Sequence, residues 1–151
     1  MAIEKGTKLR EKIIQFTVSR EGMDGWVSDL VNLLTLNGNY FLGIMGECGS
    51  EMGCIRFITE SPNEVRPLLE VQGIHFCERE VIVVRLRSLD NLDGILRCLK
   101  NGEIRILYVY GLIINAEDKA GLVLMVDDIE MGIKILVHNG YEIFGQDNLS
   151  R

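Results

Sequence analysis

The sequence predicts an α+β fold of two tandem βαββαβ units, each an antiparallel four-stranded sheet covered on one face by two helices. Three observations predict it. Segments of period-two and helical apolar spacing follow the order strand, helix, strand, strand, helix, strand twice. The turn EGMDGW at 21–26 returns as DNLDGI at 90–95, 69 positions later. Gly73 and Gly140, which end the second helix of each unit, lie 67 positions apart.

The first unit is predicted to span residues 11–78. A strand over 12–19 places Ile14, Phe16 and Val18 on one face. The turn follows, and then a helix that ends at Asn37-Gly38. The remaining elements are a strand over 40–47, a return strand over 54–59, a helix that opens with the capping sequence SPNE at 61–64, and a strand that starts at 74–77.

The second unit is predicted to span residues 79–147 and repeats this order. Its first helix is predicted to be about a turn and a half shorter, because Gly94 and Gly102 are 8 residues apart while Gly25 and Gly38 are 13 apart. Its elements are a strand over 81–86, a short helix after the turn at 90–94, a strand over 104–114, a strand over 121–126, a helix capped by Asp127-Asp128, and a strand over 141–144.

Composition narrows the class of protein. The chain has 151 residues, 47% of them hydrophobic and 25% charged, which is typical of a soluble globular protein. The net charge of −6 argues against nucleic acid as a partner. No apolar run approaches the roughly 20 residues that span a bilayer, and the charged N-terminus has no signal-peptide pattern. We therefore expect a cytoplasmic protein without a membrane partner.

The four cysteines, Cys48, Cys54, Cys77 and Cys98, form no C-x-x-C pair. Without an export signal they are expected to be reduced and mostly buried. A zinc site built from three of them with His75 would match no usual ligand spacing. We predict no metal and no cofactor.

Catalytic patterns are not supported by the spacing of the chemically active residues. No Ser-His-Asp, Cys-His or paired-carboxylate arrangement stands out, and His75 and His138 are alone in their segments. The glycines of GIMGECGSEMG lack the order of a phosphate-binding loop and bracket a hairpin. We expect no catalytic residues and no enzyme.

Several stretches in register resemble the ACT domain. One is the turn EGMDGW or DNLDGI, and a second is the helix end and strand in LTLNGNYFLGIM and CLKNGEIRILYVYG. A third is the strand–Asp–helix–Gly ending in RFITESPNEVRPLLEVQGIHF and LVLMVDDIEMGIKILVHNGYEI. The resemblance covers about residues 11–146, and the chain looks like a tandem ACT-domain protein of ferredoxin-like topology.

The resemblance implies regulation. ACT domains usually bind a small effector, often an amino acid, where the strand-to-helix loop of one unit meets its neighbour. With no attached catalytic or DNA-binding domain in the sequence, the chain resembles a free-standing sensor or a separate regulatory subunit of a metabolic enzyme. Exposed sheet edges and faces need cover, so we also expect the two sheets to join side by side, or two chains to pair into a homodimer.

The candidate ligand-binding residues lie in and after the two turns. A helix N-terminus offers free N–H groups and a partial positive charge that suit a carboxylate. The alternative is that Asp24 and Asp93 cap their own helices and leave no room for an anion. The candidates are Gly22, Met23, Asp24, Gly25, Asn39 and Tyr40 in the first unit, and Asn91, Leu92, Asp93 and Gly94 in the second.

The sequence also supports a preference between the two candidate sites and leaves two alternatives open. The first unit is the better candidate site, because its first helix is predicted to be full length. Tyr108 and Tyr110 point to one face of a strand. Such a pair is usually core or cross-strand packing, whereas the ACT resemblance implies a pocket or a subunit interface. The rival to an amino-acid sensor is a protein-interaction module whose ligand loops have degenerated.

Overall fold

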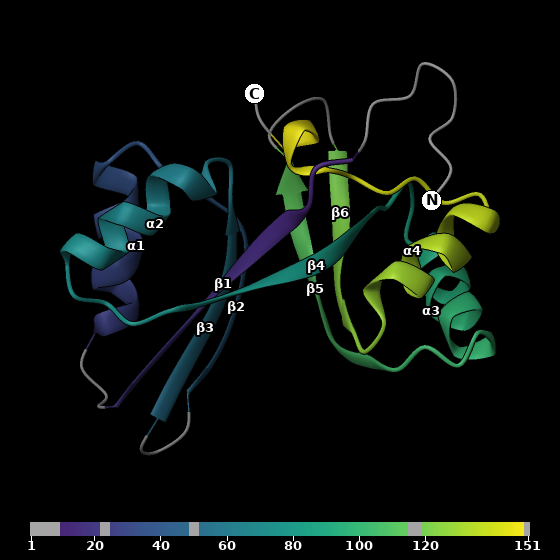
Figure 1. Cartoon of the computed structure of the whole chain (residues 1–151), viewed down its shortest axis with the longest axis horizontal. Helices are drawn as coiled ribbons and strands as arrows, with labels where there is room; N and C mark the ends of the chain where they lie inside the picture. The colour runs from purple at the N-terminus through teal and green to yellow at the C-terminus, as the bar shows by residue number, and fades with distance from the viewer. Residues whose placement is uncertain (1–9, 22–24, 49–51, 115–118, 150–151) are drawn as a thin grey trace.

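The computed structural model describes residues 10–21, 25–48, 52–114 and 119–149. Over these residues the chain forms six strands and four α-helices (Figure 1). In order they are β1 (Ile13–Glu21), α1 (Trp26–Leu36), β2 (Phe41–Cys48), β3 (Met52–Thr59), α2 (Pro62–Val71), β4 (Cys77–Arg85), α3 (Asn91–Asn101), β5 (Ile106–Ile114), β6 (Lys119–Val126), α4 (Ile129–His138) and the short 3₁₀ turn η1 (Gln146–Asn148).

The strands form one antiparallel series in the order β2-β3-β1-β4-β6-β5. In the first half of the chain the second strand is outermost, followed by the third, the first and the fourth. The second half has the same order when β4 is counted as its first strand, because β6 lies next to it and β5 is outermost. The mixed α+β fold that the sequence predicted is therefore present.

β4 belongs to both halves. Its residues Cys77–Val81 pair with β1, and its residues Ile82–Arg85 pair with β6. The predicted strands starting at 74–77 and at 81–86 are thus one continuous strand, and the expectation of eight separate strands was wrong. The predicted boundary between residues 78 and 79 falls inside this strand.

The predicted last strand over 141–144 is reduced to a single bridge between Ile143 and Val84. Two further backbone hydrogen bonds, from Arg85 to Glu142 and from Phe144 to Val83, hold the segment against β4 at 2.8 Å each. The segment is too short to form a regular strand, but it lies beside β4 where the fourth strand of the second unit was expected.

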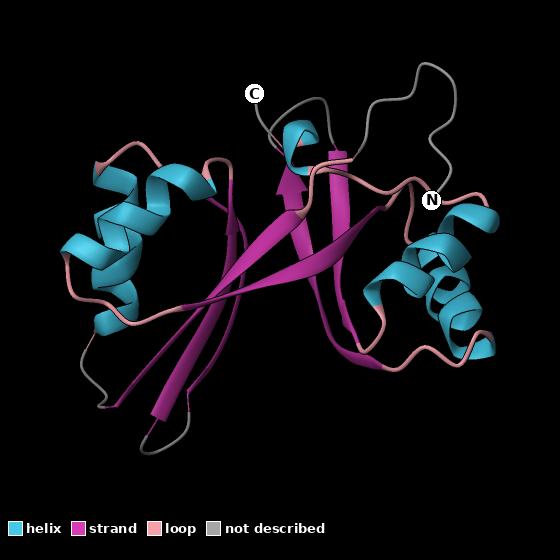
Figure 2. Cartoon of the chain, in the orientation of Figure 1, coloured by secondary structure: helices cyan, strands magenta, loops and turns pink. Residues whose placement is uncertain are grey.

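The helices cover the outer faces of the strands. Figure 2 shows α1 and α2 at one side of the molecule and α3 and α4 at the other, with all strands between them. Each helix pair encloses its own apolar core, centred on Phe16, Phe57 and Leu34 in the first half and on Val84, Leu124 and Leu99 in the second.

A third core lies between the helix-free faces of the strands. It contains Ile13, Ile58, Val83 and Leu112. Both faces of β4 are therefore buried, which explains its continuous apolar run VIVV. The sequence predicted that the two sheets would join side by side, and they do so through β4. The packing of the helix-free faces on each other was not predicted.

A polar cluster crosses this central core. Gln15 of β1 is fully buried. Its Nε2 donates to the Tyr108 hydroxyl at 2.7 Å, and its Oε1 accepts from the Tyr110 hydroxyl at 2.7 Å. Both tyrosines come from β5, so the predicted pair packs between the two halves of the molecule.

Three smaller expectations have clear outcomes. Asp128 caps α4, with its Oδ1 accepting from the Met131 N–H at 3.0 Å, as predicted. Ser61 stands at the N-cap of α2 but its side chain makes no capping hydrogen bond, so the predicted capping box does not form. Cys77 is exposed and Cys54 is half-buried, so the expectation of mostly buried thiols was wrong.

Two kinds of feature are absent from the described residues. None of the helices in this part of the chain has the length and apolar character needed to cross a bilayer. No group of three or more histidine, cysteine, aspartate or glutamate side chains comes together there in a metal-binding arrangement.

Candidate functional site

The turn of the first half leads directly into α1. Gly25 is the N-cap residue of this helix, with φ 60° and ψ 11° in the left-handed region that favours glycine. Among the described residues, a Cβ placed there would meet no atom within 4 Å, so no described side chain covers this backbone. Gly22, Met23 and Asp24 lie outside the described residues, and the N-cap position is occupied by Gly25.

The two candidates after α1 point elsewhere. Asn39 is buried, its N–H donates to the Leu34 carbonyl at 2.9 Å, and its side chain donates to the Asn37 carbonyl at 3.2 Å. Tyr40 lines a separate groove beside Gly111 of β5. The structure therefore does not bring Asn39 and Tyr40 together with Gly25.

The second turn is built into its helix. α3 begins at Asn91 and has 11 residues, as α1 does, so the prediction of a shorter helix was wrong. The reason lies in Asn91, whose Oδ1 accepts from the N–H groups of Arg87 at 3.1 Å and Ser88 at 3.3 Å and moves the turn upstream. Asp93 consequently lies inside the first turn and pairs with Arg97, so it does not cap the helix.

Gly94 is occupied by a side chain of the protein itself. A Cβ at Gly94 would lie 2.3 Å from the hydroxyl of Tyr141, which shows how closely the tyrosine packs on α3. Leu92, two residues earlier, is 36% exposed. In the structure Asn91, Asp93 and Gly94 thus take part in the turn, an ion pair and packing, and the ligand-binding role of the second-half candidates stays a prediction.

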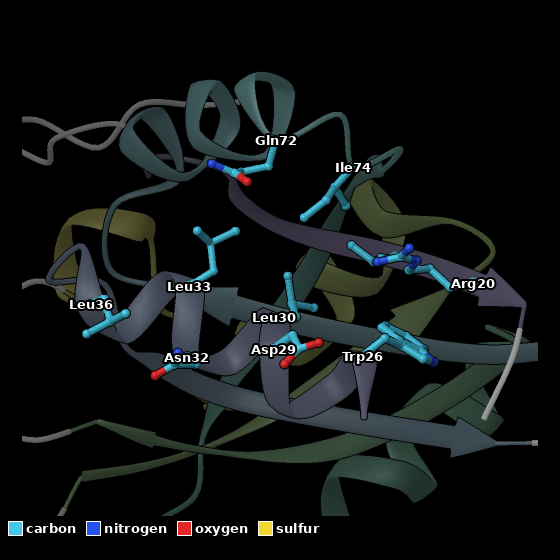
Figure 3. Close-up of a pocket in the computed structure, with 10 residues that line it drawn as sticks. Arg20, Trp26, Asp29, Leu30, Asn32, Leu33, Leu36, Gln72 and Ile74 are labelled. Carbon is cyan, nitrogen blue, oxygen red and sulfur yellow. The ribbon is translucent and has the colours of Figure 1, made fainter. Parts of the chain in front are cut away.

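An open cleft lies beside the first helix, between α1, the end of β1 and the segment after α2 (Figure 3). We call it the α1 cleft, and its volume is about 350 Å³, near the lower limit of small-molecule sites. Its lining residues are Val18, Arg20, Trp26, Asp29, Leu30, Asn32, Leu33, Leu36, Gln72 and Ile74.

Two opposite charges face this cleft. Arg20 extends over it from β1, and Asp29 borders it from α1 on the other side, as Figure 3 shows. Neither side chain forms an ion pair with another residue in the described part of the chain. Both groups are therefore available to a ligand that carries a negative and a positive group.

The floor of the cleft is apolar and well packed. Val18 and Leu30 are buried there, and Trp26 is only 8% exposed. A Cβ at Gly53 of β3 would lie 2.9 Å from the Trp26 ring, so this strand supports the indole directly. The ring is a fixed wall of the cleft.

The second half has Tyr141 at the position of Ile74. Each follows the glycine that ends a helix, and each donates its N–H to a carbonyl five residues earlier, Ile74 to Leu69 at 2.9 Å and Tyr141 to Leu136 at 3.0 Å. The ring of Tyr141 packs on α3 at Gly94, whereas Ile74 leaves the space beside α1 open.

No protein-family model matches the sequence, and no curated protein matches it. A crystal structure of protein BT0572 from Bacteroides thetaiotaomicron matches with a TM-score of 0.83 at 15% identity, over 94% of this chain and 98% of that chain. The ligand-free regulatory subunit of aspartate kinase from Thermus thermophilus matches with a TM-score of 0.54 at 13% identity, over 87% and 93%. A structure of aspartokinase alpha and beta subunits matches with a TM-score of 0.54 at 13% identity, over 84% and 91%.

At these identities the likeness shows the fold alone. It supports the ACT-like fold that the sequence resemblance implied, since aspartate kinase regulatory subunits are among the neighbours. The matched region covers 98% of the BT0572 chain and 93% of the Thermus thermophilus regulatory subunit.

Proposed function

We propose that this protein binds a small effector, an amino acid, and regulates an enzyme or regulator of amino-acid metabolism. The observation that carries the proposal is the α1 cleft, where Arg20 and Asp29 face one open space from opposite sides. The structural similarity to a regulatory subunit of aspartate kinase supports the regulatory part of the proposal.

The chemistry of a free amino acid fits this pair of charges. Its α-carboxylate needs hydrogen-bond donors with positive charge, and a guanidinium supplies two in a planar fork. Its α-ammonium needs an acceptor with negative charge, which a carboxylate supplies. Arg20 and Asp29 provide one of each, and the free backbone beside Gly25 lies at the N-terminal end of the same helix.

The ligand-binding role is proposed for the first half alone. Gly25 remains a candidate of the turn, and Gly22, Met23 and Asp24 remain predictions. In the second half Tyr141 fills the corresponding space, and Asp93 is engaged by Arg97. The proposal thus keeps the original preference for the first unit but rests it on the open cleft instead of helix length.

We further propose that the chain consists of two tandem ACT-like units over 11–78 and 79–147. The proposal is supported by the equal pairing order of strands in both halves and by the matching hydrogen bonds of Ile74 and Tyr141. β4 is the structural link, since it pairs with β1 in one half and with β6 in the other.

A homodimer is also proposed, and β5 is its proposed contact. β5 is the outermost strand of the series and carries no charged residue or proline between Ile106 and Ile114. β2 of the same chain lies against β5 near Gly111, so the proposed contact is the exposed apolar face of β5. Leu107, Val109 and Ile113 are 48%, 37% and 75% exposed on the strand face opposite the central core.

The same apolar row favours a second candidate function, in which the protein is an interaction module that holds a partner enzyme and binds no effector. Leu107, Val109 and Ile113 would then serve the partner. The two functions differ in whether an amino acid stabilises the isolated protein, because a ligand that binds the native state must raise its stability.

A thermal-shift titration with each of the twenty amino acids tests the proposed function. At 100 times Kd a ligand stabilises the native state by about 2.7 kcal/mol, which corresponds to a rise in Tm of roughly 5–10 °C for a protein of this size. We expect such a rise with at least one L-amino acid and none with its D-isomer. The absence of any rise, together with co-purification of a metabolic enzyme, would favour the interaction module.

A further inference from the structure

We propose that the α1 cleft selects amino acids with an uncharged apolar side chain, of the size of leucine, isoleucine or methionine. This inference rests on the proposed function, because it uses the same cleft, but it makes a claim of its own about which amino acid is bound.

The charged residues that line the cleft can pair with the two backbone charges of an amino acid whose side chain is neutral. Arg20 and Asp29 are the two charged residues among those that line the cleft. When the first holds the carboxylate and the second the ammonium of the ligand, no described lining residue is left to neutralise a third charge. A side-chain carboxylate or ammonium would therefore lose its hydration against groups that cannot replace it.

The polar groups that remain are neutral and few. Asn32 and Gln72 contribute amides from α1 and from the end of α2, and in Figure 3 these side chains lie apart from the Arg20 end of the cleft. A hydroxyl-bearing ligand would gain hydrogen bonds only by reaching these amides. This arrangement does not suit a short polar ligand held at Arg20 and Asp29.

The space between the charges and the amides is apolar. Leu30, Leu33 and Ile74 line it, and Val18 and the fixed Trp26 ring close its floor. A side chain that extends from the charged end of the cleft would lie along these groups. Burial of each additional methylene there strengthens binding about fourfold, so leucine should bind roughly 10- to 100-fold more tightly than alanine, which is three carbons shorter.

Trp26 provides the readout. It is the single tryptophan of the chain, so its fluorescence reports directly on the cleft. We would titrate the full-length protein with leucine, isoleucine, methionine, alanine, threonine, lysine and aspartate, and measure Kd by Trp26 fluorescence and by calorimetry. The expected order places the three larger apolar amino acids first, alanine at least about tenfold weaker, and lysine and aspartate weakest.

Two analogues of leucine assign the two charges. Isocaproate lacks the ammonium group and isoamylamine lacks the carboxylate. Arg20→Gln should weaken isocaproate about 10- to 100-fold and leave isoamylamine nearly unchanged, whereas Asp29→Asn should do the reverse, since a hydrogen bond to a charged group contributes energies of that order. Arg79→Gln and Glu70→Gln, at exposed residues outside the cleft, serve as matched controls that should change neither Kd.

The outcomes separate the two proposals. If lysine, aspartate or threonine binds more tightly than leucine and Arg20→Gln still weakens it, the selectivity proposed here is wrong and the amino-acid-binding function stands. If both analogues respond equally to both substitutions, the assignment of the charges is wrong. If no amino acid binds, the proposed function fails and this inference fails with it.

Discussion

Gln15 is a polar residue in an otherwise apolar centre, and its two hydroxyl partners come from the other half of the chain. Tyr110 donates to it from a buried position, and burial raises the pKa of this phenol above its ordinary range, so the hydroxyl keeps its proton at neutral pH. Arg56 lies over the Tyr108 ring at 4.6 Å from its centroid. The cluster therefore fixes β1 and β3 of one half against β5 of the other.

Tyr110→Phe should destabilise the protein by about 1–3 kcal/mol, because the buried Oε1 of Gln15 loses its donor and stays desolvated. Tyr108→Phe should cost less, since Tyr108 is half-buried and Gln15 Nε2 also lies 3.4 Å from the Thr17 hydroxyl. Urea denaturation of both variants measures the difference. Equal losses of stability would contradict the role assigned to burial at Tyr110.

Some of the residues of the candidate site could be predicted from the sequence, and others could not. The glycine turn before α1 was visible as the repeated Asp-Gly, and Gly25 does adopt the left-handed conformation. Arg20 and Asp29 were missed, because charged residues at a strand end and on a helix are usually solvated. Their convergence depends on the crossing of β1 and α1, which no spacing rule encodes.

Among the elements, β4 is the strand that the sequence could not delimit. The charged stretch Glu78-Arg79-Glu80 looks like a break between two strands. In the structure these residues stay in the strand, and Glu78 forms two hydrogen bonds with Arg66 of α2, at 2.8 and 2.5 Å. The paired Arg66 guanidinium lowers the pKa of Glu78 below its usual range. The charged residue Glu78 therefore forms an ion pair between β4 and α2 and does not end the strand.

Glu78→Gln tests this pair through the dependence of stability on pH. Because the folded state lowers the pKa of Glu78, its stabilisation is present above the ordinary glutamate pKa of about 4.3 and is lost as the pH falls through the lower folded value. We expect the variant to be at most about 1 kcal/mol less stable than wild type at pH 7, with the difference vanishing in acid.

Urea denaturation at both pH values measures the effect. Glu130→Gln is the matched control, since the Glu130–Lys134 pair on α4 is exposed, and it should change stability at neither pH. A loss that persisted unchanged in acid would show that Glu78 acts through packing.

The two halves differ in the residue that follows the glycine at the end of their second helix, which is Ile74 in the first half and Tyr141 in the second. The two residues occupy equivalent positions. Only the packing in the structure shows that Tyr141 fills the space beside its helix and that Ile74 leaves the equivalent space open. Gly94 is what admits the tyrosine. Both residues are visible in the sequence, but the sequence alone does not indicate which half has an open cleft.

Ile74→Tyr should close the α1 cleft in the way that Tyr141 closes the second half. We expect binding of the preferred amino acid to weaken at least about tenfold while the circular dichroism spectrum stays unchanged. Ile74→Val, which removes one methyl group, is the matched control and should retain binding. If Ile74→Tyr binds as wild type does, the ligand does not occupy the α1 cleft.

For the whole molecule, the sequence predicted the α+β class and the order of elements well, because both follow from apolar periodicity and glycine stops. It did not predict that the two helix-free faces would pack on each other. Alternating residues such as Ile13 and Val81 indicate a buried face, but the partner of that face is a long-range choice. The merging of two strands into β4 follows from the same packing.

The apolar row on β5 makes a prediction about assembly. Ile113→Lys places a charge on the exposed face of this outermost strand and should convert the proposed homodimer to monomer, as edge charges oppose strand association. Sedimentation velocity measures the change, with the exposed Val71→Lys on α2 as control. A wild-type protein that sediments as a monomer at all concentrations would contradict the homodimer.

According to the proposed function, one amino acid binds in the α1 cleft of each chain. Calorimetric titration of the full-length protein with leucine, side by side with Ile74→Tyr, tests it most directly. We predict a stoichiometry of one leucine per chain for wild type, because Tyr141 fills the second half, and no measurable heat for the variant. Two leucines per chain, or equal binding by Ile74→Tyr, would contradict the account.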